Sequence, residues 1–112
     1  MAAAGIGFKN NVSEDYPYYA TVAASQTAQL LGTSGGAKGD LFAYLIIIPG
    51  TTSPGNVVIK DGSTSITVFT GGATSVQDLK PFVVPLHMLS VTGPWAVTTG
   101  ANVTAIAVGG FT

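Results

Sequence analysis

Side chains that could carry out catalysis are few and scattered in this sequence. Nucleophilic catalysis needs a serine, threonine or cysteine beside a base, and the one histidine, His87, stands in the apolar stretch Pro-Leu-His-Met-Leu. A single histidine in such surroundings is more often a strand residue that finds a hydrogen-bond partner than a catalytic base. We therefore predict no catalytic residue and no enzyme activity.

The isolated aspartates fit a structural role better than acid–base chemistry. Asp40, Asp61 and Asp78 each lie beside glycine or leucine at the end of an expected element. A short carboxylate at such a place accepts hydrogen bonds from backbone N–H groups of turns and caps. A carboxylate pair for glycoside hydrolysis is the alternative, but neither the spacing nor the neighbouring aromatic residues indicate a cleft.

No metal or cofactor site is predicted. The chain has no cysteine and one histidine, and no aspartate-rich loop has the alternating oxygen ligands of an EF-hand. A calcium ion held largely by backbone carbonyls of a loop stays open. The segment Gly35-Gly-Ala-Lys-Gly39 differs from a phosphate-binding loop because Lys38 is followed by glycine in place of serine or threonine.

Trp95 is the one tryptophan, and it follows Gly93-Pro94. Together with the tyrosines it could form a platform on which a sugar ring stacks. The alternative places Trp95 at the start of an inward-facing strand, with its indole N–H bonded to a loop carbonyl. The second arrangement is the commoner one for a tryptophan next to a turn, and contact with glycans is left open.

The charge of the chain argues against two classes of partner. Four lysines and five acidic residues among 112 give a net charge of −1. Such a chain lacks the basic surface that captures nucleic acid or an anionic membrane. The longest apolar run, Leu41–Ile48, is far shorter than the roughly 20 residues of a spanning helix. We expect synthesis in a cytoplasm and, because so little charge keeps copies apart, assembly into an oligomer.

The first 17 residues are expected to form an N-terminal arm, and residues 18–112 a single β-sandwich domain. Glycine and asparagine loosen the arm, whereas Phe8, Tyr16, Tyr18 and Tyr19 are large aromatic residues that could anchor it on a neighbouring subunit. The alternative is an N-terminal strand packed on its own domain. We name these four aromatic residues and Trp95 as the candidate interface residues.

Short runs rich in valine, isoleucine and threonine predict an all-β fold. Strands are expected at 18–24, 28–31, 41–48, 56–60, 65–69, 80–86, 88–91, 95–98 and 103–108, with a short helical turn or edge element at 75–79. The run 41–48 is apolar at every position, which predicts a central strand with both faces buried. Asp61-Gly62 predicts a tight hairpin of type I′. Pro81 and Pro85 place their strand at an edge or at a bulge.

About eight strands, with Greek-key connections indicated by the glycine-rich loop 32–39, favour a two-sheet sandwich of the jelly-roll type. Three stretches carry a resemblance to a known group of proteins: Ala23–Thr27, Leu45–Ser63 and Thr98–Phe111. They resemble the small all-β auxiliary virion proteins of tailed bacteriophages, and among these the head decoration, or cement, proteins. The resemblance spans roughly residues 20–111 and includes no catalytic motif.

The resemblance implies a structural protein on the outer surface of a phage head. Such proteins commonly form trimers, bind the major capsid protein and reinforce the joints between capsomers. This role needs no cofactor, and it agrees with the absence of a predicted catalytic site. A tail, neck or fibre component would have a similar composition, and a carbohydrate-binding module would require an exposed Trp95.

Overall fold

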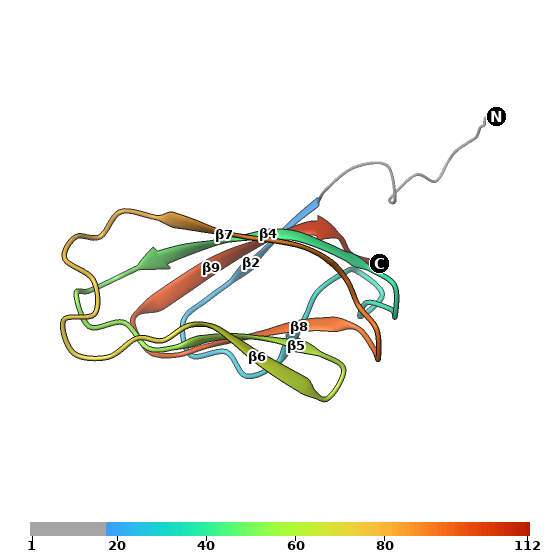
Figure 1. Cartoon of the computed structure of the whole chain (residues 1–112), viewed down its shortest axis with the longest axis horizontal. Coiled ribbons are helices and arrows are strands. Elements are labelled where there is room, and N and C mark those ends of the chain that lie inside the picture. Colours follow the sequence, from blue (N-terminus) through green and yellow to red (C-terminus); the bar gives the residue numbers. More distant parts are fainter. Residues whose placement is uncertain (1–17) are drawn as a thin grey trace.

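The computed structural model describes residues 18–112, which form eight strands in two antiparallel sheets that face each other (Figure 1). In the first sheet the order is β2 (Tyr18–Val22), β9 (Val103–Gly110), β4 (Leu41–Pro49) and β7 (Phe82–Leu89). In the second it is β3 (Gln29–Leu30), β8 (Trp95–Thr99), β5 (Val57–Asp61) and β6 (Thr64–Phe69). The predicted all-β fold of two packed sheets is confirmed. Phe8 and Tyr16 of the expected arm lie outside the described residues.

The core lies between the sheets and is built by alternation along the strands. On β9 the inward residues are Val103, Ala105 and Ala107, and these small side chains leave room for larger ones from neighbouring elements. Leu45 and Ile47 of β4 lie opposite Ala107 and Ala105. Phe42 lies opposite Gly109, with its ring edge-on to Trp95 at 5.4 Å and to Phe111 at 5.3 Å between centroids. Edge-to-face pairs at this separation are favourable for aromatic rings.

The strand predicted over 41–48 is confirmed as β4, which lies between β9 and β7. The expectation that both of its faces are buried is wrong for residues 18–112. Phe42, Leu45 and Ile47 point into the core, whereas Ile46 and Ile48 on the other face are only half-buried. Residues 18–112 therefore cover one face of β4 and leave its other apolar face without a covering layer.

The segments 80–86 and 88–91, predicted as separate strands, contribute to one strand, β7, and the expected edge position is confirmed for the strand that contains Pro85, whereas Pro81 precedes it. β7 is the edge strand of its sheet, and Pro85 lies on it. Its register with β4 shifts between Phe42 and Tyr44, where β7 carries an extra residue and His87 adopts a φ of 55°. An edge position and a bulge both tolerate a residue that has no N–H to donate.

The predicted hairpin is present, but its turn differs from the predicted type. Asp61 pairs with Thr64, so Gly62 and Ser63 are the two central residues. Gly62 has a φ of 60°, and Ser63 is not among the residues with positive φ. Glycine at the first central position is typical of a type II′ turn. Residues 70–81 contain neither helix nor strand, so the element expected at 75–79 is absent from that loop.

Candidate functional site

Asp61 is a buried carboxylate that organises the loop between β7 and β8. Its two oxygens accept hydrogen bonds from the backbone N–H groups of Val91 at 2.8 Å, Thr92 at 3.0 Å and Gly93 at 3.1 Å. Burial acts to raise the pKa of Asp61, but these bonds outweigh it and hold the pKa below its ordinary value. Asp61 thus stays ionised and serves as a cap, as the sequence predicts.

Asp40 has a corresponding role at the C-terminal end of the chain. Its carboxylate accepts the N–H of Ala37 at 2.9 Å and the N–H of Thr112 at 3.0 Å, and its backbone carbonyl accepts the Trp95 indole N–H at 2.8 Å. Both buried carboxylates therefore have backbone partners. His87 lies exposed on β7. Within residues 18–112 there is no group of three or more His, Cys, Asp or Glu side chains that could hold a metal ion.

The feature that sets this sandwich apart is the outward face of the sheet β2-β9-β4-β7. Residues opposite each other in an antiparallel sheet share a face. One row of such partners is Tyr19, Val108, Tyr44 and Pro85, and the next is Thr21, Ile106, Ile46 and Val83. Ile48 and the pair Leu41 and Leu89 extend the same face. We call these residues the apolar face.

Several residues of the apolar face are widely exposed. Tyr19 is 76% exposed, Leu89 62% and Val83 57%, whereas Ile46 and Ile106 between them are half-buried by their neighbours. Isolated exposed apolar residues are ordinary, but a contiguous set on one sheet marks an interaction surface. Four strands at about 4.8 Å spacing and about eight residues of 3.3 Å rise give this face roughly 500 Å².

The outward face of the other sheet provides an internal comparison. Most of its paired positions hold small, hydroxylated or charged side chains: Val58, Lys60, Ser65, Thr67, Ala96 and Thr98. Leu30, opposite Ala96, is the exposed large apolar residue on this face. The outward face of the sheet β3-β8-β5-β6 is thus typical of a surface in contact with water, whereas the apolar face is typical of a surface that packs against another molecule.

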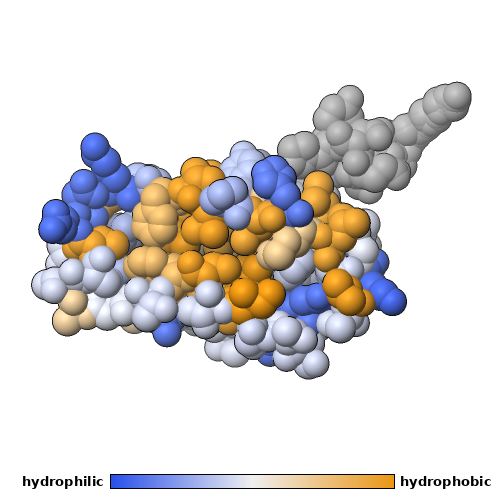
Figure 2. All heavy atoms as spheres, in the orientation of Figure 1, coloured by the Kyte–Doolittle hydropathy of each residue, from blue (hydrophilic) through white to orange (hydrophobic). Residues whose placement is uncertain are grey.

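Apolar side chains also gather at the surface across the middle of the view in Figure 2, in the gap between the two sheets.

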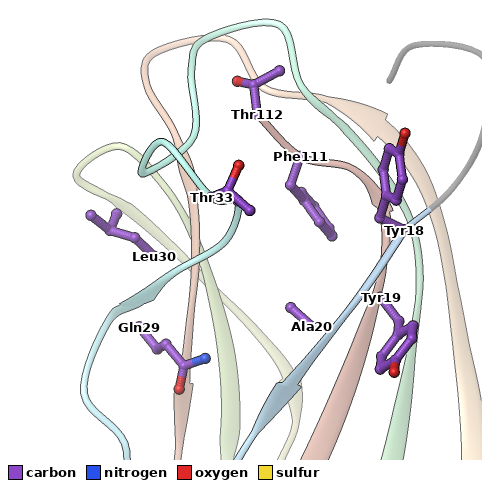
Figure 3. A pocket seen from close by; sticks show the side chains of 9 residues that line it. Tyr18, Tyr19, Ala20, Gln29, Leu30, Thr33, Phe111 and Thr112 are labelled. Atoms are coloured by element: carbon purple, nitrogen blue, oxygen red, sulfur yellow. The ribbon is translucent and has the colours of Figure 1, made fainter. Parts of the chain in front are cut away.

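A hollow of about 600 Å³ opens at the edge of the sandwich, between β2 of one sheet and β3 of the other (Figure 3). We call it the edge hollow. Its lining includes Tyr18, Ala20, Gln29, Leu30, Thr33 and Phe111. None of the lining residues has a charged side chain, and Leu30, one of them, is 53% exposed. A space of this size and character accommodates an apolar group with a few neutral polar contacts.

The structure assigns different places to the candidate interface residues. Tyr18 and Tyr19 lie on β2, where both line the edge hollow and Tyr19 also belongs to the apolar face. Trp95 is 2% exposed and packs in the core, so its assignment as an interface residue is corrected. It also offers no platform for a sugar ring, because the ring packs edge-on against Phe42 and the N–H is used by Asp40.

The sequence interpretation missed Val83, Leu89 and Leu30, which are the exposed apolar residues on β7 and β3. A signal was present for the first two, since the run 82–89 contains apolar residues at both alternating positions. Leu30 had no such signal, because its two-residue strand is too short to show an alternating pattern.

Comparison with known proteins identifies no relative. No protein-family model, no curated protein and no solved structure matches this chain. Among the described residues, no helix has the length and hydropathy needed to cross a membrane.

Proposed function

We propose that this chain is a structural virion protein that decorates the outer surface of a phage head and reinforces the joints between capsomers. The observation that carries the proposal is the apolar face. β4 has the composition of a strand covered on both sides, and residues 18–112 cover one side only. The second cover then comes from another molecule, either a further copy of the chain or the shell.

The size of the apolar face is sufficient for such a contact. Two faces of roughly 500 Å² bury about 1,000 Å² in total when they pack together, which is near the lower limit for a specific interface. Contacts made by isoleucine, valine and tyrosine depend little on salt, whereas ion pairs are screened over about 10 Å at 0.1 M ionic strength. A protein that must stay on a particle in varied media benefits from this kind of contact.

Assembly into a trimer would add strength without new chemistry. Closed rings are the usual form of homo-oligomers, and a ring of three presents three identical surfaces to the shell. The second and third contacts then form within one complex, which raises their effective concentration, so weak individual contacts give lasting attachment. The interleaved strand orders of the two sheets support a jelly-roll assignment, and eight-stranded jelly rolls occur in viral capsid proteins.

A tail, neck or fibre component is the second candidate, because the apolar face would serve assembly there equally well. The location of the protein in the virion, on the head or on another part, distinguishes this candidate from the decoration role. The carbohydrate-binding module considered for the sequence has lost its main support, since Trp95 is buried.

Co-sedimentation with phage heads tests the proposal. The full chain is mixed with heads assembled from the major capsid protein of the genome that encodes it, in expanded and unexpanded form. We expect saturable binding to expanded heads that persists at 0.5 M NaCl, where the Debye length is about 4 Å. Binding to isolated tails but not to heads would favour the second candidate, and binding to neither would refute a virion role.

A further inference from the structure

The strand β2 offers a free backbone edge beside the edge hollow. Within the described residues it pairs with β9 on one side only. The carbonyl of Thr21 accepts a hydrogen bond at 3.1 Å from the side-chain amide of Gln29, which comes from the other sheet. This carbonyl therefore points away from β9. Since N–H and C=O of one residue point to the same side in an antiparallel strand, Tyr19 and Thr21 both direct their backbone groups to this second edge, where the Thr21 carbonyl is the one already used by Gln29.

A free strand edge next to an apolar hollow is the arrangement that binds an added strand. The backbone groups of the edge supply hydrogen bonds, and alternate side chains of the added strand enter the hollow. The side chains that line the edge hollow are uncharged and include Leu30, Phe111 and Ala20, so the hollow fits aliphatic or aromatic side chains. Unprotected edges of this kind otherwise lead to aggregation, which native proteins avoid by covering them.

The chain itself contains a segment of the required kind. Residues 5–9 read Gly-Ile-Gly-Phe-Lys, in which Ile6 and Phe8 are two positions apart and would lie on the same side of a strand. The segment belongs to the 17 residues that precede Tyr18, the first residue of β2. It is therefore joined to the domain at the same edge of the sandwich that carries the edge hollow.

We infer that residues 5–9 of a neighbouring copy add to the free edge of β2, with Ile6 and Phe8 entering the edge hollow. A neighbouring copy is favoured over the same copy by chain length. Return to its own β2 would need residues 10–17 as a hairpin loop of eight residues, where two to five are usual. Extended, eight residues reach about 26 Å, more than the roughly 19 Å width of a four-stranded sheet.

This inference rests on the proposed oligomer and specifies how its copies are joined. The donor segment and the acceptor edge are different surfaces, so each copy gives one contact and receives another. Head-to-tail contacts of this type close into rings when the rotation allows, and a trimer is the smallest such ring beyond the dimer. Tyr18 and Tyr19 then belong to the acceptor site, in contrast to their predicted role as anchors of the arm.

Disulfide trapping tests the inference, because the chain has no cysteine of its own. Full-length Phe8→Cys and Leu30→Cys, one of them enlarged by a tag, are mixed, oxidised gently and separated without reductant. The matched control replaces Leu30→Cys by Leu79→Cys, since Leu79 is 50% exposed against 53% for Leu30 but does not line the edge hollow. We expect at least about fivefold more cross-linked heterodimer with Leu30→Cys, because docking raises the local thiol concentration.

A chain carrying both Phe8→Cys and Leu30→Cys identifies the donor. Donation between copies yields a ladder of linked chains, whereas docking on the same copy yields closed monomers and overturns the inference. Equal yields with Leu30→Cys and Leu79→Cys overturn it as well. Two measurements separate this failure from that of the proposed function. Light scattering on the unmodified chain tests the joining of copies, since a monomer overturns the inference. Co-sedimentation with heads tests the decoration role, which a trimer without specific cross-links leaves intact.

Discussion

Replacement of Asp61 by asparagine tests the structural role assigned to the buried carboxylates. One carboxylate oxygen accepts Val91 N–H at 2.8 Å, and the other accepts the N–H groups of Thr92 at 3.0 Å and Gly93 at 3.1 Å. Asparagine keeps one acceptor oxygen, so its amide nitrogen faces a backbone N–H. The variant loses a charge-assisted hydrogen bond and leaves one buried donor unsatisfied, together about 3 kcal/mol.

This loss corresponds to a melting temperature lower by about 10 to 20 °C for a domain of this size. Thermal unfolding followed by Trp95 fluorescence measures it, because Trp95 lies in the core. The matched control is Asp78→Asn, since Asp78 lies exposed and accepts a single hydrogen bond, from Lys80 N–H at 3.2 Å. We expect the control to melt within about 2 °C of the unmodified chain.

The pH dependence follows from the lowered pKa of Asp61. A carboxylate whose folded-state pKa is below its unfolded value of about 3.9 stabilises the fold fully above that value. The stabilisation is lost as the pH falls through the folded-state pKa. The gap between the unmodified chain and Asp61→Asn should therefore be constant from pH 7 to 5 and narrow below pH 4. Equal melting of Asp61→Asn and Asp78→Asn at pH 7, or a gap that widens in acid, would refute the reasoning.

Two further substitutions test the packing. A Cβ on Gly36 would lie 2.8 Å from both the Leu31 carbonyl oxygen and the Pro94 Cβ, whereas one on Gly39, which also has positive φ, meets nothing within 4 Å. Gly36→Ala should thus destabilise the fold by about 2 kcal/mol more than Gly39→Ala in urea unfolding, and equal effects would contradict this. Trp95→Phe leaves the Asp40 carbonyl without its indole donor and should lower the free energy of unfolding by about 2 kcal/mol; an unchanged midpoint in the same titration would contradict it.

The elements of the fold were largely predictable because local chemistry determines them. The apolar run at 41–48, the turn at Asp61-Gly62 and the proline of β7 each depend on neighbours in sequence. The pairing of strands far apart in the chain is different. Nothing local indicates that Tyr18–Val22 lies beside Val103–Gly110, a contact on which the acceptor edge depends.

The type of residue at the candidate site was predictable from the sequence, but the position of those residues in the fold was not. Tyr18 and Tyr19 were identified from their size, and they do lie at the surface of β2. Trp95 was included for the same reason, although its position opposite Phe42 could not be known before the sheets were packed. The apolar face was misinterpreted as a second buried face, since a sequence does not distinguish an intramolecular cover from an intermolecular one.

The measurement that tests the association surface most directly is the mass of the chain by light scattering after size exclusion, for three proteins. Val83→Lys places a charge on the apolar face at a residue of edge strand β7 that is already exposed. Thr67→Lys makes a matching change on the outward face of the other sheet, at edge strand β6. We predict a trimer for the unmodified chain and for Thr67→Lys. Val83→Lys is expected to be a monomer where a further copy covers the apolar face, or a trimer that no longer co-sediments with phage heads where the shell covers it. A monomeric unmodified chain, or a Val83→Lys protein that keeps both its mass and its binding to heads, would contradict the account.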